Sequence, residues 1–396
     1  MATESIQWRY PLADLDLGEP EQQAVAAVLQ SKWLTMGAQT QAFEAEFASA
    51  HGAKYAVAVG NCTQALHMAL LALGIGPGDE VIVPSLSFVA TANAVLYTGA
   101  TVRFAEVIGL HNPTINPQSV LSLVNKHTRA IIPMHYAGYP CQMQPLADLA
   151  DRHKMAIIED VAHAPGASLN GRALGTYGSI GAFSFFSNKN LSTGEGGMLL
   201  TDSESLDARL RLLRSHGMTT LTWDRHKGHA NTYDVVALGY NNRIDEIRSA
   251  IGRVQLAKLA ANNQRRLQLT HRYWQAFAGS PVQTPFSDGY SGDPTDHPMV
   301  KPAGHIMPVL LPKGANRANV MAALRQAGIQ TSIHYPPIHS FTAYRQRYGE
   351  QSLPITEEYA ARELTLPLYP ALGEDDVDTI AKAVISAIGE TKEKEQ

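Results

Sequence analysis

The chain has 396 residues, of which 45% are hydrophobic and 17% are charged, and its formal net charge at pH 7 is −4. This length allows one large domain or two ordinary ones, and the hydrophobic share excludes a wholly disordered protein. Basic residues do not exceed acidic ones (32 against 36), so we expect no nucleic-acid partner. Two cysteines, Cys62 and Cys141, cannot form a disulfide framework. Neither a secretory signal nor a membrane-spanning stretch is recognisable, which predicts a cytoplasmic protein.

Short apolar runs alternate with helical patterns through the first 200 residues. The runs are rich in Val, Ile, Leu or Phe and lack strict alternation, which is typical of strands buried on both faces of a mainly parallel sheet. We expect strands at Tyr55–Gly60, Glu80–Pro84, Thr101–Val107, Arg129–Met134, Met155–Asp160, Gly181–Phe186 and Gly197–Thr201. Helices are expected between strands at Thr63–Leu73 and Gln144–His153, so the pattern predicts a layered α/β domain.

Longer helical segments appear after residue 202. The elements expected there are helices at Ser205–Ser215, Ile244–Trp274 and Arg317–Ala327 and a short strand at Ile329–His334. The second helix exceeds ordinary globular lengths, so we expect it to bend or to link two domains. The stretch Gly279–Gly304, rich in Gly, Pro, Ser and Asp, is predicted to be a loop. We therefore place a large domain at residues 1–255 and a smaller α/β domain at residues 256–396.

Several common binding motifs are absent from the sequence. No Gly-x-Gly-x-x-Gly follows a predicted strand and no Walker A motif occurs, which disfavours dinucleotide and P-loop functions. His226 and His229 have a spacing that some metals tolerate, but two histidines in a polar loop are usually solvated. We therefore expect no metal site.

Polar residues follow two of the predicted strands, at the edge where open α/β sheets bind ligands. Gly60-Asn61-Cys62-Thr63 joins a strand to a helix, whose free N–H groups and dipole would attract a phosphate. An ordinary N-cap made by Asn61 or Thr63 explains the same residues. Asp160 ends another buried strand, where it could bind a metal, cap a loop or pair with a cationic heterocycle.

Lys189 lies just beyond a predicted buried strand and precedes a loop with Gly194, Gly196 and Gly197. Lysine is normally solvated. Near an apolar pocket its amine loses proton affinity and becomes nucleophilic, as in lysines that form Schiff bases. The glycines would let the backbone approach a bound ring closely. A surface lysine beside a turn is the alternative.

Together these features match the needs of one cofactor. Pyridoxal phosphate requires a Schiff-base lysine, an acidic partner for its pyridine nitrogen and a phosphate cradle. Lys189, Asp160 and the turn at residues 60–63 would supply them. The sequence therefore predicts pyridoxal 5'-phosphate as cofactor, with Lys189 also moving a proton as general base and acid.

Six segments also occur in a characteristic order between Ser31 and Pro370. They are GNCTQALHMAL, GDEVIVPSLSFVATANAV, IIEDVAHAPGA, FSFFSNKNLSTGEGGML, LRSHG and LGYNNRIDEIRSAIGRVQL. In these segments the chain resembles the DegT/StrS group of nucleotide-sugar aminotransferases, within the fold type I pyridoxal-phosphate enzymes. The resemblance implies a large domain with a seven-stranded, mostly parallel sheet and a smaller C-terminal α/β domain. It also implies a homodimer with active sites at the subunit interface.

The resemblance assigns roles around the cofactor. Lys189 would form the Schiff base, Asp160 would pair with the pyridine nitrogen, and His163 would lie beside the ring and its phenolic oxygen. Phe88 would stack on the ring, although core packing explains it equally well. The phosphate would be bound by Cys62, Thr63, Ser184 and, from the partner subunit, Asn241.

The resemblance also suggests substrate contacts at Thr35, Arg243 and His339. Arg243 could equally form a structural salt bridge or serve the interface, and His339 could be structural. Trp223–Asn231 carries Arg225 and Lys227, which would meet a substrate diphosphate unless this loop is simply solvated.

These observations predict an aminotransferase that places an amino group, from L-glutamate, on a keto-sugar linked to a nucleotide. A keto-cyclitol substrate and a regulatory protein that binds the cofactor without turnover are the alternatives. Some relatives instead remove a sugar oxygen and carry His in place of the lysine, and Lys189 argues against that reaction.

Overall fold

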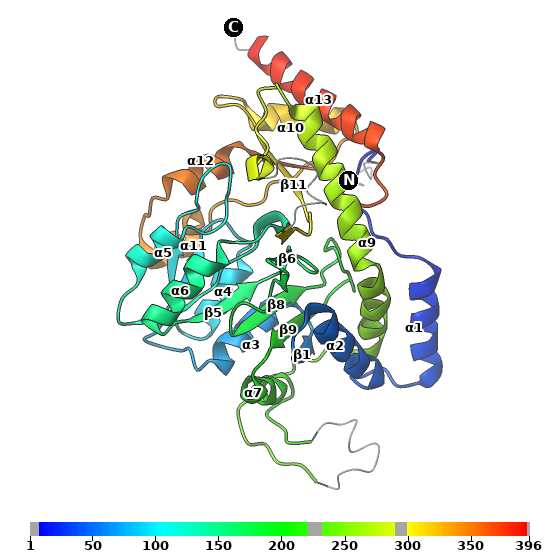
Figure 1. Ribbon diagram of the computed structural model, residues 1–396, viewed down its shortest axis with the longest axis vertical. Coiled ribbons are helices and arrows are strands. Elements are labelled where there is room, and N and C mark those ends of the chain that lie inside the picture. The colour runs from blue at the N-terminus through cyan, green and yellow to red at the C-terminus, as the bar shows by residue number, and fades with distance from the viewer. Residues whose placement is uncertain (1–7, 221–231, 290–298, 394–396) are drawn as a thin grey trace, which may run out of the picture.

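A seven-stranded sheet with helices on both faces forms the centre of the computed structural model, which describes residues 8–220, 232–289 and 299–393 (Figure 1). Its strands are β1 (Tyr55–Val59), β2 (Glu80–Pro84), β3 (Thr101–Ala105), β4 (Thr128–Ile131), β5 (Ala156–Asp160), β8 (Ile180–Ser184) and β9 (Gly197–Thr201). All seven correspond to predicted strands, and several end slightly before their apolar runs do. The predicted α/β fold class is therefore confirmed for the sheet.

The strands lie in the order β1-β9-β8-β5-β4-β2-β3. The pairs β2–β3, β2–β4, β4–β5 and β5–β8 are parallel, whereas β9 is antiparallel to both β8 and β1. Strand β1 therefore runs in the same direction as β8. Because parallel strands end at the same edge of a sheet, the loops after β1, β2, β4, β5 and β8 meet at one edge, where β9 begins.

Side chains on each strand alternate between two faces of the sheet. In β1, Val57 and Val59 share a core with helices α3 (Cys62–Ala72), α4 (Ala90–Tyr97) and α7 (Glu204–Arg214). Ala56 and Ala58 face α2 (Ala38–His51) and α9 (Glu246–Phe277), and α5 (Pro117–Leu123) and α6 (Met143–His153) cover a third core. Burial on both faces explains why the strand sequences are apolar throughout.

The predicted helices correspond to α3, α6, α7, α9 and α10 (Arg317–Gln326). The described residues also form α1 (Glu19–Ser31), α11 (Thr342–Tyr348), α12 (Pro354–Arg362) and α13 (Glu374–Glu393). A small sheet is formed by β6 (Ser168–Leu169), β7 (Arg172–Ala173) and β10 (Val300–Lys301). Helix α9 contacts α1 and α2 as well as α13, and Figure 1 shows it running from beside the central sheet up to α13.

The C-terminal part has a sheet and a core of its own. Strands β11 (Met307–Leu310) and β12 (Glu363–Leu366) pair antiparallel and pack with α10, α13 and the end of α9. The predicted strand at Ile329–His334 is wrong, because this segment makes isolated bridges to Tyr10 and Thr365 rather than a strand. The N–H of His334 donates to the carboxylate of Glu363 (2.9 Å), so a side chain takes the place of a strand partner.

Other predictions concern the chain beyond the central sheet. The domain boundary after residue 255 falls inside helix α9 and stays a prediction. The predicted loop Gly279–Gly304 is described up to Gly289 and from Met299 onward, with a short 3₁₀ turn at Ser287–Gly289 and strand β10 in it. Within the described ranges, no helix is both long and apolar enough to cross a membrane.

Glu246 joins the beginnings of α9 and α2. Its carboxylate accepts hydrogen bonds from the backbone N–H groups of Gly37 (2.8 Å), Gln39 (2.7 Å) and Thr40 (2.9 Å), which begin helix α2. The first N–H groups of a helix have no partner within the helix, so this carboxylate caps α2. Asp245 caps α9 itself by accepting from the N–H of Arg248 (2.9 Å).

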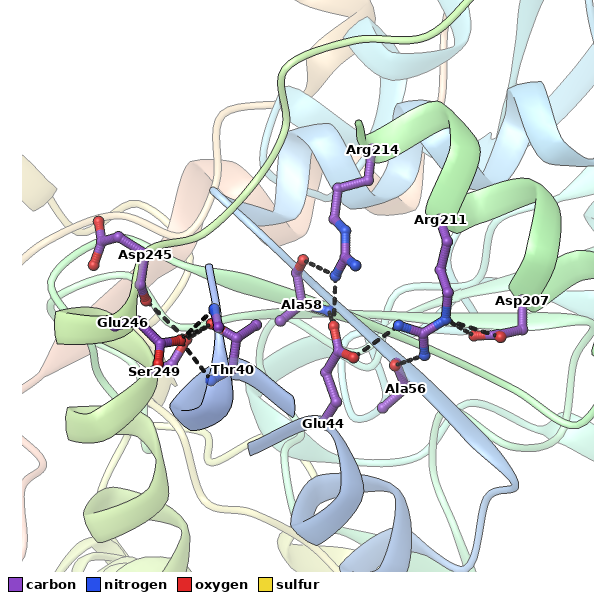
Figure 2. A network of polar contacts seen from close by, with 11 residues as sticks. Thr40, Glu44, Ala56, Ala58, Asp207, Arg211, Arg214, Asp245, Glu246 and Ser249 are labelled. Atoms are coloured by element: carbon purple, nitrogen blue, oxygen red, sulfur yellow. Dashed lines mark hydrogen bonds and ion pairs between the residues drawn. The ribbon is translucent and has the colours of Figure 1, made fainter. Parts of the chain in front are cut away.

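A buried ion-pair network ties α2 to α7 across strand β1. Figure 2 shows Glu44 between Arg211 and Arg214. Its carboxylate lies 2.9 Å from Arg211 and also pairs with Arg214, which is 1% exposed. Arg211 also donates to the carbonyl of Ala56 and Arg214 to that of Ala58. Burial would raise the pKa of Glu44, but the two guanidinium groups outweigh it and lower this pKa. The network therefore fixes both helices to the strand that leads into the Gly60–Thr63 turn.

Glu44→Gln should lower the free energy of unfolding by about 3 kcal/mol, because Arg214 loses its countercharge in a buried place. Glu46→Gln is the matched control on the same helix. The Glu46 side chain is 43% exposed and pairs with Arg253, so this change should cost about 0.5 kcal/mol or less. Urea unfolding at pH 7 measures both, and equal losses would contradict the prediction.

The difference in the free energy of unfolding between wild type and Glu44→Gln should depend on pH. Because the folded-state pKa of Glu44 is lowered, its contribution is present above the unfolded-state pKa and is lost as pH falls through the folded-state value. The difference between wild type and Glu44→Gln should therefore shrink at acid pH.

Candidate active site

A cavity of about 390 Å³ lies at the sheet edge where the parallel strands end. Its lining comes from Asn61, Cys62 and Thr63 after β1, Phe88, Ala90 and Thr91 after β2, Met134 after β4, Asp160, Ala162 and His163 at the end of β5, Ser184, Phe186, Asn188 and Lys189 at the end of β8, Glu195 before β9, and also Leu66, His334 and Tyr335. The common direction of the strands thus brings together seven predicted site residues: Cys62, Thr63, Phe88, Asp160, His163, Ser184 and Lys189.

Asp160 is the last residue of β5 and is 4% exposed. Its Oδ2 accepts a hydrogen bond from the Thr91 hydroxyl (2.7 Å) and its Oδ1 accepts one from the N–H of Ala162 (3.1 Å). Burial raises the pKa of Asp160, while these donors and the nearby Lys189 oppose the rise. A buried carboxylate held in this way favours a cationic partner in the cavity.

Lys189 follows β8 and its amine reaches the same cavity. Burial lowers the pKa of Lys189 to about 8, although Asp160 and Cys62 act in the opposite direction. With such a pKa about one molecule in ten carries a neutral, nucleophilic amine at pH 7, far more than for a solvated lysine. The amine therefore has the reactivity that the sequence predicts.

His163 lies beside Asp160 and contacts the C-terminal part of the chain. The N–H of Ala137 donates to its Nδ1 (3.3 Å), so the ring hydrogen is on Nε2 and points to the Tyr335 hydroxyl (2.8 Å). Burial, with a smaller contribution from Lys189, lowers the pKa of His163 well below its usual range. The ring is therefore neutral and donates one hydrogen bond.

The turn after β1 is built for an anion. Asn61 caps α3 by accepting from the N–H of Gln64 (2.9 Å), and the next N–H groups begin the helix without intrahelical partners. A Cβ on Gly197 would lie 2.6 Å from the carbonyl carbon of Asn61, so this glycine lets β9 start directly against the turn. At Gly197 the glycine-rich loop therefore approaches the backbone of the turn, whereas the sequence predicts its approach to a bound ring.

The surroundings of Cys62 and Phe88 bear on their predicted roles at the cofactor. Burial, followed by the charge of Asp160, raises the pKa of the Cys62 thiol well above its ordinary value, which suits a small turn residue rather than a reactive thiol. Phe88 is 57% exposed, and its ring centroid lies 6.0 Å from that of Tyr335. Simple core packing therefore does not explain Phe88.

Four predicted residues lie outside the cavity lining. Thr35 and Asn241 are exposed and form isolated bridges, and Arg243 is half-buried, with a pKa that burial and then Arg214 lower. His339 is 4% exposed, and its ring nitrogens contact the hydroxyl of Ser85 (2.7 Å) and the carboxylate of Glu357 (3.2 Å). The roles of these four residues stay predictions. His226, His229, Arg225 and Lys227 lie outside the described residues.

Sequence reasoning missed several residues of the site. Thr91, Asn188, His334 and Tyr335 line the cavity, and Asn188 Oδ1 is a buried acceptor without a hydrogen-bond partner. His334 and Tyr335 open the motif HYPPIH, in which the prediction singled out His339 instead. The described residues contain no group of three or more His, Cys, Asp and Glu side chains that could hold a metal ion.

The set of donors fits pyridoxal phosphate chemically. A nucleophilic amine, a buried carboxylate and a helix N-terminus beside the Ser184 hydroxyl match its aldehyde, its pyridine nitrogen and its phosphate. The unsatisfied Asn188 oxygen is a further polar atom at the same cavity. The fold and this site define a fold type I enzyme of the pyridoxal-phosphate-dependent class.

Comparison with known proteins identifies the family. Residues 15–385 match the DegT/DnrJ/EryC1/StrS aminotransferase family, and the chain belongs to it. Over 376 residues it is 39% identical to the spore coat polysaccharide biosynthesis protein SpsC of Bacillus subtilis, covering 93% of this chain and 94% of SpsC. The enzyme is thus an aminotransferase, as the sequence predicts.

The fold is shared with solved aminotransferase structures. PseC of Helicobacter pylori, an aminotransferase involved in the biosynthesis of pseudoaminic acid, has a TM-score of 0.88 at 28% identity, over 96% of this chain and 99% of PseC. The PLP form of Spr1654 from Streptococcus pneumoniae has a TM-score of 0.87 at 26% identity, over 96% of this chain and 99% of that chain. The predicted fold type I architecture is confirmed.

Thr91→Val should destabilise the cofactor-free chain by about 1–2 kcal/mol at pH 8, because the buried Asp160 carboxylate loses a donor. Losing this donor raises the pKa of Asp160 further, and a raised carboxyl pKa costs stability as pH rises. The loss should therefore be smaller at pH 4.

Ser87→Ala is the control for this variant. It removes the 2.7 Å hydrogen bond between Ser87 and Thr91 but leaves the bond from Thr91 to Asp160. Denaturant unfolding of both variants at the two pH values separates the effects. If the loss of stability in Thr91→Val does not change with pH, the Asp160 carboxylate is not its cause.

Proposed function

We propose that this aminotransferase carries pyridoxal 5'-phosphate on Lys189 and places an amino group from L-glutamate on a keto-sugar linked to a nucleotide. The observation that carries the proposal is the Lys189 amine with a lowered pKa in one cavity with the Asp160 carboxylate. The names of SpsC and PseC, which refer to polysaccharide and pseudoaminic acid biosynthesis, support a carbohydrate substrate.

Each part of the cofactor has a partner in the cavity. The first N–H groups of α3 at Cys62 and Thr63, with the Ser184 hydroxyl, would hold the phosphate. Asp160 would pair with the pyridine nitrogen, and Phe88 would cover the ring. When bound, the cofactor supplies an electron sink for the carbon that loses a proton.

The protein itself provides the acid and base groups. Burial makes the Asp160 carboxylate costly, so a protonated ring nitrogen would relieve that cost and be stabilised in return. Lys189, with its pKa near neutrality, can take up a proton and return it at the reacting carbon. His163 would donate its Nε2 hydrogen toward the phenolic oxygen side of the ring, where it now meets Tyr335.

A homodimer is part of the proposal. Asn241 is exposed and lies outside its own cavity, near exposed apolar side chains at Val235 (55%), Val236 (56%) and Leu238 (85%). An apolar surface of this kind favours a protein contact. We propose that Asn241 reaches the phosphate of the partner's site, that Thr35, Arg243 and His339 serve the substrate side, and that the enzyme is cytoplasmic.

The alternatives differ in what they predict for turnover. A keto-cyclitol aminotransferase would share every cofactor contact and differ in its substrate alone. A regulatory protein would bind the cofactor without turnover, and the aminotransferase family of this chain disfavours that alternative. Deoxygenation of the sugar is disfavoured because the lysine is retained.

Borohydride reduction of the protein mixed with pyridoxal phosphate should fix the cofactor on Lys189, because its amine is the nucleophile of the cavity. Peptide mapping locates the label. Lys189→Ala should lose it and Lys301→Ala, which changes an exposed lysine, should keep it. A label on any other lysine refutes the assignment.

Asp160→Asn should slow amino transfer from L-glutamate by about 10²- to 10³-fold, because the ring nitrogen loses a charged partner. The assay uses a panel of nucleotide-linked keto-sugars and keto-cyclitols, with circular dichroism to check folding. Asp151→Asn, at an exposed position on α6, should leave turnover unchanged. Undiminished turnover by Asp160→Asn would count against its role, and turnover of cyclitols alone would replace the proposed substrate.

A further inference from the structure

The amine of Lys189 has a neighbour that no sequence motif indicated. His305 precedes strand β11 and is 3% exposed, and its Nε2 lies 3.3 Å from Lys189 Nζ. Its backbone is fixed on both sides, since its N–H donates to the carbonyl of Ala137 (2.9 Å) and its carbonyl accepts from Arg266. The ring therefore lies against the lysine from the C-terminal part of the chain, behind the cavity lining.

A chain of side-chain amides determines where the hydrogen of this imidazole lies. Asn263 donates through Nδ2 to the carbonyl of Pro165 (2.8 Å), so its Oδ1 accepts from Asn190 Nδ2 (2.8 Å). Asn190 Nδ2 also donates to the carbonyl of Ala303 (2.8 Å), and this bond fixes the orientation of the Asn190 amide. Asn190 Oδ1 therefore faces His305 Nδ1 (2.9 Å) as an acceptor, and Nδ1 must carry the hydrogen.

The opposite nitrogen of His305 consequently presents a lone pair. A neutral imidazole with its hydrogen on Nδ1 accepts at Nε2 and cannot donate there. Burial, followed by the charge of Lys189, lowers the pKa of His305 well below its usual range, so the ring stays neutral at physiological pH. Lys189 can therefore donate to His305 as an ammonium ion or as a free amine.

We propose that His305 is a positioning residue, which accepts a hydrogen bond from the Lys189 amine and thereby directs the lone pair of that amine into the cavity. A free amine has two hydrogens and one lone pair, and rotation about the Cε–Nζ bond would otherwise spread the lone pair over several directions. Holding one hydrogen at His305 restricts that rotation. The inference rests on the proposed function, in which Lys189 is the reactive amine.

Among the described residues, the titratable groups that interact electrostatically with Lys189 or His305 are Asp160 of β5, Cys62 of α3, His163, His334 and Arg266 of α9. Glu195 and Tyr335 also line the cavity. Burial keeps the Cys62 thiol protonated and lowers the pKa of His334 to about 4, and His163 is neutral as well. Asp160 therefore attracts the Lys189 ammonium, while His305 contributes an uncharged acceptor.

The test compares His305→Leu, which removes the acceptor at similar size, with His305→Gln, whose amide oxygen can replace it. Acetic anhydride labelling of the full-length, cofactor-free chain as a function of pH, read at the Lys189 peptide, gives the pKa of this amine. Wild type should titrate near pH 8. His305→Leu should titrate about one unit lower, because the ammonium ion loses a hydrogen bond, and His305→Gln should stay near wild type.

An unchanged Lys189 titration in His305→Leu, or a Gln variant that behaves like the Leu variant, would overturn the inference. If His305→Leu fails to fold, a second measurement still tests the proposal. Nitrogen NMR of histidine-labelled wild-type protein, assigned by the signal lost in His305→Gln, should show hydrogen on Nδ1 between pH 6 and pH 9, and hydrogen on Nε2 would refute the proposal. Neither measurement needs bound cofactor, so a failed borohydride test of Lys189 would be distinguishable from failure here.

Discussion

The common direction of strands β1, β2, β4, β5 and β8 is the constraint on which the site depends. Strands that run in the same direction end at the same edge of the sheet, so residues that are far apart in the sequence lie close together there. Strand β9 runs against its neighbours and returns to that edge, where Gly197 packs on the turn at Asn61. The ion pairs of Glu44 hold two helices against β1 and thereby fix the start of this arrangement.

Burial gives the cavity its chemistry. Removing water lowers the pKa of Lys189 and raises that of Asp160, so each group is shifted toward its neutral form. The surrounding histidines are neutral for the same reason and act through the positions of their hydrogens. Hydrogen-bond partners therefore decide what each ring does: Ala137 leaves the His163 hydrogen for Tyr335, and Asn190 leaves a His305 lone pair for Lys189.

The central sheet was predictable because strands buried on both faces leave continuous apolar runs, as at Glu80–Pro84. The strand expected at Ile329–His334 was wrong because the segment makes only isolated bridges, to Tyr10 and Thr365. These long-range contacts, and the bond from the N–H of His334 to Glu363, have no local signal in the sequence. The same limit applies to the site. Motifs beside strand ends located Asp160 and Lys189, whereas Thr91 and His305 act through contacts set by the tertiary fold alone. Both ring nitrogens of His339 contact polar side chains outside the cavity lining, and its motif alone could not reveal this.

The contribution of the C-terminal part to the cavity has a consequence for synthesis of the protein. Asp160 and Lys189 leave the ribosome long before His305, His334 and Tyr335, and the residue that holds His334, Glu363, follows later still. Until these residues have been made, the Lys189 amine lacks its His305 neighbour and the cavity lacks the part of its wall that His334 and Tyr335 form. The cavity is therefore completed only after the C-terminal part of the chain has been synthesised.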